Sequence, residues 1–172
     1  MQITGMKRKF HIRSATAADV PVILQFIREL ADYEKLLHEV TATEDVLRRN
    51  LFGERPMAEV ILAVKDGVEV GWALFFQNFS TFLGKPGIYL EDLYVRPEFR
   101  GRGYGKAMMV HLARLARQRD CGRFEWAVLD WNKPSLDFYQ SIGAQGMTDW
   151  ILHRMTGEAI AALAEQKMPW EI

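Results

Sequence analysis

Apolar residues in the first third of the chain recur every three or four positions, the spacing that lines one face of an α-helix. The first such stripe contains Val20, Ile23, Leu24, Ile27 and either Leu30 or Ala31. Thr16, with Asp19 three residues on, is a weak form of the capping box that starts helices. A second start at Thr43 precedes a stripe of Val46, Leu47 and Leu51. The pattern predicts two amphipathic helices after a short strand at residues 10–13.

From residue 58 the apolar spacing changes to every second position, which is typical of β-strands. Val60, Leu62 and Val64 share one face, and Asp66-Gly67 is a pair that favours a hairpin turn. The pattern therefore predicts strands over 58–64 and 68–76. A loop with Gly and Pro spans 80–87. A further strand is predicted over 88–95, ending before Pro97.

The C-terminal half alternates helical and extended patterns. Met108, Leu112 and Leu115 predict a helix over 107–119, which a strand at 124–129 and a short helix at 134–140 follow. A last strand is predicted at 149–155 and a terminal helix at 156–164. The elements run as one strand, two helices, an antiparallel run of strands and then β-α-β-α-β, which indicates a mixed α/β fold.

Composition narrows the class of protein. A length of 172 residues favours a single domain over 1–172, and 22 basic against 22 acidic residues argue against a nucleic-acid binder. The single cysteine, Cys121, cannot form an internal disulfide and fits the cytoplasm. No stretch reaches the roughly 20 apolar residues of a membrane span, and no signal peptide is evident. The four histidines lack metal-ligand spacing, so no metal site is predicted.

A glycine-rich turn between the strand at 88–95 and the helix at 107–119 is the most informative segment. It runs Arg100-Gly101-Arg102-Gly103-Tyr104-Gly105-Lys106. Glycines let backbone N–H groups approach a ligand, and a helix N-terminus favours an anion. Seven basic residues and one acidic residue over 96–119 suit a polyanionic ligand. A tight turn before a solvated basic helix would give the same pattern.

Two other phosphate-binding loops are excluded by particular residues of this turn. A Walker loop would need glycine in place of Arg100 and a hydroxyl residue in place of Ala107. A dinucleotide fingerprint would need glycine in place of Lys106. Neither an NTP-binding loop nor a Rossmann turn is therefore predicted.

Two motifs together resemble the GNAT superfamily of acetyltransferases. Arg100-x-x-Gly103-x-Gly105 is similar to its acetyl-CoA pyrophosphate loop, and Asn132-x-x-Ser135-x-x-x-Tyr139 to its second signature. Segments at 12–19, 29–34, 89–92 and 128–132 further resemble the diamine acetyltransferases, including the spermidine/spermine enzymes. Segments at 80–81, 127–132, 143–145 and 157–159 are more similar to the thialysine N-acetyltransferase branch of that group. The similarity covers about residues 10–164. It implies a mostly antiparallel mixed sheet flanked by helices, with a splayed central strand pair, acetyl-CoA as co-substrate and a homodimer.

The resemblance also implies roles for single residues. The cofactor would be bound by Leu93, Tyr94 and Val95 near the thioester, by Arg100, Gly101, Arg102, Gly103, Tyr104, Gly105 and Lys106 at the pyrophosphate, and by Asn132, Lys133, Pro134 and Ser135 along CoA. The amine would face Tyr33, Glu34, Glu91, Glu125, Trp126 and Ala127. Tyr139 would be the general acid that protonates the CoA thiolate.

The chemistry of amine acetylation favours a carboxylate beside the acceptor. A primary amine with a pKa near that of Lys, about 10.4, must lose a proton before it attacks a thioester. Glu91 can attract the cation and accept this proton, directly or through water. Alternation along a strand places Glu91 and Asp92 on opposite faces, and Glu91 is preferred because it shares a face with Leu93.

The sequence thus predicts transfer of an acetyl group from acetyl-CoA to a primary amine of a small molecule, by direct attack in a ternary complex. Diamines, polyamines, thialysine and lysine-like amino acids remain open as acceptors. Against a polyamine, Ser80 stands where the polyamine enzymes have an acid, and the segment after Gly143 lacks their Glu-Gly-Trp run. A protein or peptide N-acetyltransferase and a non-catalytic acyl-CoA sensor are the alternatives. The sensor is disfavoured because Tyr139 and Glu91 are both present.

Overall fold

Five strands form one sheet in the order β1-β2-β3-β4-β5 in the computed structural model, which describes residues 10–168 and 170. The strands are β1 (Phe10–Ser14), β2 (Glu59–Lys65), β3 (Val68–Ser80), β4 (Lys85–Val95) and β5 (Arg123–Trp126). The helices are α1 (Val20–Tyr33), α2 (Glu44–Phe52), α3 (Tyr104–Gln118), α4 (Lys133–Ser141) and α5 (Gly157–Ala164), with 3-10 turns at Ala17–Asp19, Leu37–Glu39 and Pro97–Phe99. The chain forms two compact units, 1–127 and 128–172.

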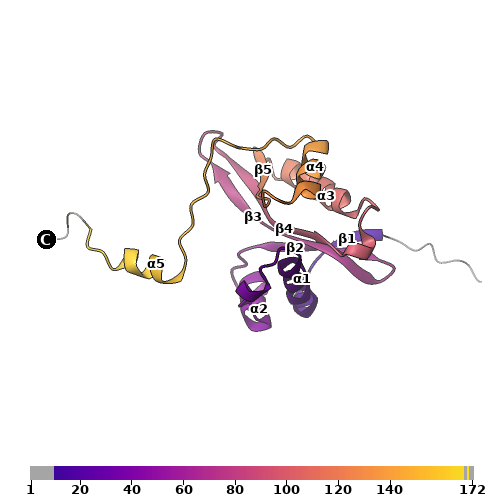
Figure 1. The fold of residues 1–172 in the computed structure, drawn as a ribbon, viewed down its shortest axis with the longest axis horizontal. Coiled ribbons are helices and arrows are strands. Elements are labelled where there is room, and N and C mark those ends of the chain that lie inside the picture. The colour runs from indigo at the N-terminus through magenta and orange to yellow at the C-terminus, as the bar shows by residue number, and fades with distance from the viewer. Residues whose placement is uncertain (1–9, 169, 171–172) are drawn as a thin grey trace, which may run out of the picture. The chain divides into compact units, whose positions relative to one another are not determined.

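The sheet is mixed and mostly antiparallel, as predicted. Each neighbouring pair from β1 to β4 is antiparallel, whereas β4 and β5 run parallel. Figure 1 shows α1 and α2 on one face of the sheet and α3 on the other. Of the helices in the described residues, none has the length and apolar character needed to cross a membrane.

The first two helices begin next to the capping residues from which they were predicted. The Asp19 carboxylate accepts a hydrogen bond of 2.7 Å from the backbone N–H of Thr16, which forms a capping box on the 3-10 turn Ala17–Asp19 that leads directly into α1. Before α2, the Thr43 hydroxyl accepts a hydrogen bond of 3.3 Å from the N–H of Val46. These caps satisfy backbone donors that have no partner inside the helix, and so they fix where each helix begins.

The hairpin between β2 and β3 is also confirmed. Asp66 and Gly67 both have left-handed backbone conformations, with φ of 57° and 82°. Two consecutive residues with positive φ form the tight turn whose twist matches that of paired strands. The Asp66-Gly67 pair thus sets the register that brings Lys65 opposite Val68.

The main core lies between the sheet and the first two helices. Ile23 and Phe26 of α1 and Leu51 of α2 pack with Trp72 of β3 and Tyr94 of β4. Val60, Leu62 and Val64 of β2 complete this cluster, as their alternate spacing predicts. We call this side of the sheet the α1 face.

The opposite side of the sheet, the α3 face, is covered by α3. Met108 and Leu112 of this helix are fully buried. A Cβ at Gly71 would lie 2.6 Å from the carbonyl oxygen of Tyr94 and 3.3 Å from Met108 Cε, so glycine is needed where β3 packs against both β4 and α3. The helix is therefore held against the strands that precede the glycine-rich turn.

The second unit contains α4 and α5, and both helices were predicted. The strand predicted at 149–155 is wrong, because these residues adopt no regular structure. A strand requires a neighbouring strand to receive its backbone hydrogen bonds, and the described part of this unit contains none. The strand predicted over 124–129 is shorter than expected, since β5 ends at Trp126.

Candidate active site

The central strands separate along their length, which leaves one edge of β4 open. β4 pairs with β5 only over Gly87–Leu90, opposite Arg123–Trp126, but it continues to pair with β3 as far as Val95. Within the described residues, no strand pairs with the β5-side edge of β4 beyond Leu90. The splayed strand pair is thus confirmed, and Leu93, Tyr94 and Val95 lie in its open part. Their backbone groups can hydrogen-bond an extended ligand that runs along the edge.

The glycine-rich turn joins the end of β4 to α3. Gly101 and Gly103 have φ of 73° and 82°, a region that favours glycine. Gly103 is the N-cap of α3 and offers no side-chain acceptor to the helix. The N–H groups of Tyr104, Gly105 and Lys106 therefore lie in the first turn, where no intrahelical acceptor exists. A ligand phosphate is the kind of group that such a turn binds.

Arg96, which the sequence did not single out, fixes the end of β4. Its guanidinium pairs with Glu29 of α1 at 3.0 Å and donates to the carbonyl oxygen of Glu69 at 2.9 Å. It also lies over the ring of Phe26, 4.6 Å from the ring centroid. Because these partners are distant in sequence, only the fold reveals that Arg96 anchors the strand that leads into the turn.

Arg100 was predicted among the cofactor contacts, and its side chain is directed toward the protein. Nε donates to the carbonyl oxygen of Val95 at 2.8 Å, and the guanidinium lies over the Tyr33 ring at 4.7 Å and the Tyr94 ring at 5.4 Å. The side chain of Arg100 thereby connects the glycine-rich turn to the end of α1. Tyr33 and Glu34, which were predicted to face the amine, lie at that end.

A β-bulge at Glu91 sets the direction of the neighbouring carboxylates. Asp92 and Leu90 pair with consecutive residues of β3, Leu74 and Phe75, so Glu91 is the extra residue. Asp92 shares a face with its partner Leu74 and thus lies on the α1 face. The prediction that Glu91 shares a face with Leu93 assumed uninterrupted alternation, and this assumption is wrong because the bulge interrupts the pattern.

Among the described carboxyl groups with a raised pKa, Asp92 has the largest shift. Burial raises its pKa from 3.8 to about 7, and the negative charges of Glu91 and Glu34 act in the same direction. Burial also raises the pKa of Glu34. Glu91 itself is exposed. The three carboxyl groups form an acidic cluster beside the open edge of β4, which a cation would stabilise.

The residues predicted on β5 divide between the two faces of the sheet. Glu125 is opposite Tyr89 in the register and lies on the α1 face, where it accepts a hydrogen bond of 2.8 Å from Asn78. Trp126 packs against Phe124 at 5.0 Å on the α3 face, and Ala127 is exposed just beyond the strand. Only Glu125 of this group shares a face with Asp92.

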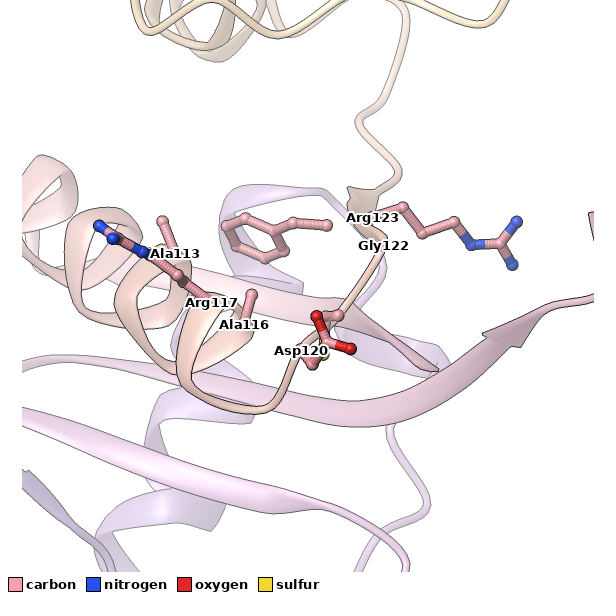
Figure 2. A pocket seen from close by; sticks show the side chains of 8 residues that line it. Ala113, Ala116, Arg117, Asp120, Gly122 and Arg123 are labelled. Atoms are coloured by element: carbon pink, nitrogen blue, oxygen red, sulfur yellow. The ribbon is translucent and has the colours of Figure 1, made fainter. Parts of the chain in front are cut away.

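A shallow hollow lies on the α3 face, near the C-terminal end of α3. Its lining includes Ala113, Ala116 and Phe124, and Figure 2 shows the Arg123 side chain directed away from it. The hollow holds none of the predicted site residues. The candidate site is therefore the open edge of β4 with the α1 face beside it.

The second unit supplies the Asn132 motif. The Asn132 side chain is buried and accepts a hydrogen bond of 3.3 Å from the N–H of Ser135, so it caps α4. Pro134 lies in the first turn, and Lys133 pairs with Asp137 at 2.7 Å. Tyr139 is half-buried, with its ring 5.3 Å from that of Phe138. The predicted motif residues thus lie on one short helix and its cap.

Comparison with known proteins gives a consistent result. Residues 24–144 match the model of the Acetyltransferase (GNAT) family. The chain is 40% identical over 164 residues to the thialysine N-epsilon-acetyltransferase of Mus musculus, with 89% of this chain and 96% of the relative covered. It is 32% identical over 205 residues to the L-ornithine N5-acetyltransferase of Arabidopsis thaliana, covering 93% and 90%. An integron cassette protein from the V. cholerae mobile metagenome has the same fold, with a TM-score of 0.78, 27% identity and coverage of 94% and 100%.

Proposed function

The chain belongs to the GNAT family of acetyltransferases, and we propose that it acetylates a small cationic amine. It is an acetyl-CoA-dependent N-acetyltransferase whose relatives act on small-molecule amines. The acidic cluster of Asp92, Glu91 and Glu34 beside the open edge of β4 is the observation that carries the proposal. Such a cluster attracts an ammonium group and can then accept its proton.

The acceptor arrives as an ammonium ion, held by the charges of Glu91 and Glu34. Asp92, with a pKa near 7, accepts the proton directly or through water when it is ionised. The neutral amine attacks the thioester carbon, and backbone N–H groups at the edge of β4 stabilise the oxyanion. The tetrahedral intermediate then expels the CoA thiolate, which takes a proton from Tyr139. The second proton lost by the acceptor nitrogen passes through water to restore the Tyr139 hydroxyl group, and Asp92 releases its proton to solvent.

We propose that backbone N–H donors bind most of the cofactor. The pyrophosphate of acetyl-CoA binds the turn of Gly101–Lys106, and the pantetheine arm follows Leu93–Val95. The family motif also assigns Asn132–Ser135 to CoA. The N–H groups at the start of α3 and the left-handed glycines before it support this assignment.

A test of the function measures CoA release with acetyl-CoA and a panel of amines that includes thialysine, lysine, ornithine, putrescine and spermidine. We expect turnover with at least one of these small amines and none, or far less, with peptide amines. Turnover of peptides alone would favour a protein N-acetyltransferase. Tight binding of acetyl-CoA without turnover of any amine would favour a non-catalytic sensor.

We further propose a homodimer, as the family resemblance implies, and a cytoplasmic location, which the single cysteine favours. Light scattering of the purified protein would test the dimer, and a mass equal to one chain at micromolar concentration would contradict it. Fractionation of the source cells would test the location. Neither proposal is needed for the chemistry described above.

Gly103→Val is expected to raise the dissociation constant of acetyl-CoA at least tenfold, about 1.4 kcal/mol. A Cβ at Gly103 would meet no protein atom within 4 Å, so the added bulk lies in the space through which a phosphate approaches. Isothermal calorimetry measures this constant. Gly84→Val is the matched control, because Gly84 is also left-handed, at φ +61°, with no atom within 4 Å of its Cβ. Equal affinities in the two folded variants would contradict the cofactor site.

A further inference from the structure

Arg100 stands between the cofactor turn and the amine side of the candidate site. Its backbone lies directly before Gly101, whose φ of 73° begins the left-handed part of the turn. Its guanidinium lies over two rings, 4.7 Å from the centroid of Tyr33 and 5.4 Å from that of Tyr94. The negative face of an aromatic ring attracts a cation within about 6 Å of its centroid. One side chain therefore joins the turn to the end of α1.

A hydrogen bond fixes the same side chain at the open edge of β4. The N–H of Arg96 donates to the carbonyl oxygen of Val70 at 3.0 Å, and Val95 is opposite Gly71. Because backbone groups alternate between the two sides of an antiparallel strand, the N–H and carbonyl groups of Val95 point away from β3. Arg100 Nε donates to that carbonyl oxygen at 2.8 Å. The Nε donor of Arg100 is thus used within the protein.

The last turn of α1, where Tyr33 lies, is held weakly by its own backbone. The N–H of Leu36 donates to the carbonyl oxygen of Ala31 at 2.7 Å. The N–H of Lys35 donates to that of Asp32 at 3.0 Å, which completes a Schellman motif. The left-handed position of this motif usually holds glycine, but here it holds Lys35, with φ of 63°. A side chain in that conformation has a steric cost, so the turn gains from a contact outside the helix.

Glu34 is the site residue whose position depends on that turn. It is the C-cap of α1, between Tyr33 and Lys35, and it is half-buried. Its charge acts on Asp92 within the acidic cluster. A shift of the last turn would therefore move Glu34 relative to Asp92 and to the ammonium group that the cluster attracts. Small displacements of this kind are costly for binding and for catalysis.

We infer that Arg100 is a positioning residue for the amine rather than a ligand of the cofactor, an inference that rests on the proposed function. Its side chain holds Tyr33, and through it Glu34, in the geometry that binds the ammonium group. A phosphate in the turn fixes the backbone that carries Arg100, so the bound cofactor tightens the binding of the amine. The coupling is reciprocal, because each ligand must change the affinity for the other by the same factor.

Calorimetry with and without CoA measures this coupling, with thialysine, ornithine and putrescine as probes. We expect the acetylated probes to bind at least fivefold more tightly to the CoA-loaded wild type than to the free protein. In Arg100→Gln this ratio should fall to about one, and KM for the amine should rise about five- to tenfold. The dissociation constant of acetyl-CoA alone should change less than twofold. Arg100→Lys, which keeps a cation beside the rings, should restore part of the loss.

Two further variants separate positioning from an effect of charge. Arg102→Gln is the matched control, because it removes the same charge from the same turn, where Arg102 lies over Phe99 at 5.7 Å. It should leave the coupling ratio at the wild-type value. Loss of a cation alone would lower KM for a cationic amine, whereas loss of positioning raises it. Lys35→Gly removes the steric cost at the end of α1, so it should recover at least threefold in KM when added to Arg100→Gln.

The outcomes separate this inference from the function on which it rests. An unchanged KM and coupling ratio in Arg100→Gln would overturn the positioning role and leave the acetyltransferase intact. Weaker binding of acetyl-CoA with unchanged binding of the amine would make Arg100 a cofactor ligand and would also overturn it. No recovery in the folded Lys35→Gly double variant would show that Arg100 does not act through the end of α1. If the wild type acetylates no amine of the panel, the proposed function and the inference fail together.

Discussion

Tyr139→Phe is expected to lower kcat by roughly 10²–10⁴ while the affinity for acetyl-CoA stays nearly unchanged. The substitution removes only a hydroxyl group and keeps the ring, which packs beside Phe138 in α4. The CoA thiolate must take up a proton as it leaves, and the proposal gives this role to Tyr139. Steady-state kinetics with a saturating amine measure kcat, and calorimetry measures cofactor binding.

A thioester with a more acidic thiol separates proton donation from packing. If Tyr139 is the general acid, the defect of the Phe variant should shrink with such a substrate, because its thiolate leaves without protonation. The same defect on both thioesters would indicate that the hydroxyl group supports the structure of α4. Wild-type turnover with acetyl-CoA would remove Tyr139 from the mechanism altogether.

Much of the fold could be predicted because its signals are local. The caps at Thr16 and Thr43 and the turn at Asp66-Gly67 use residues within a few positions of one another, and the structure confirms each. The strand predicted at 149–155 depends on a pairing partner that its own residues do not specify. The apolar run after Trp126 likewise predicted a strand to residue 129, but pairing with β4 ends at Leu90.

The candidate site could be predicted only in part, for a similar reason. The glycine turn is visible because its conformation requires glycine at Gly101 and Gly103. The bulge at Glu91 is a property of the pairing with β3, so alternation along β4 could not reveal on which face Glu91 lies. The raised pKa of Asp92 arises from burial and from Glu34, which is distant in sequence.

Asp92→Asn is expected to lower kcat/KM for cationic amines by roughly 10²–10⁴, the usual contribution of general-base catalysis. Asparagine keeps the shape of the side chain but cannot accept the proton. In the wild type, the rate should rise as Asp92 ionises near pH 7. In the variant, this rise should move to higher pH, because deprotonation then relies on the amine itself and on bulk base. Rate profiles from pH 5 to 10 measure the displacement.

The same substitution should stabilise the folded protein at alkaline pH. The pKa of Asp92 is about 7 in the folded state against an ordinary value of 3.8, so between these values the unfolded chain is ionised while the folded chain keeps its proton. The free energy of unfolding of the wild type therefore falls as pH rises from about 4 through 7. The asparagine side chain does not ionise, so the Asp92→Asn variant should have the higher Tm at pH 8 and lose this advantage near pH 4. A lower Tm for the variant at pH 8 would mean that the Asp92 carboxylate is stabilised by the fold.

Glu91→Gln decides which carboxylate accepts the proton. If Asp92 is the base, Glu91→Gln removes attraction for the ammonium group and also one of the charges that raise the pKa of Asp92. We then expect kcat/KM to fall chiefly through a higher KM and the rise of the rate to move toward lower pH, opposite to the displacement in Asp92→Asn. If Glu91 is the base, as alternation along the strand suggested, its variant carries the profile displaced to higher pH and Asp92→Asn does not. Asp92 is half-buried, whereas Glu91 is exposed. Because a base near pH 7 requires burial to raise its pKa, we expect the displacement to higher pH in Asp92→Asn alone.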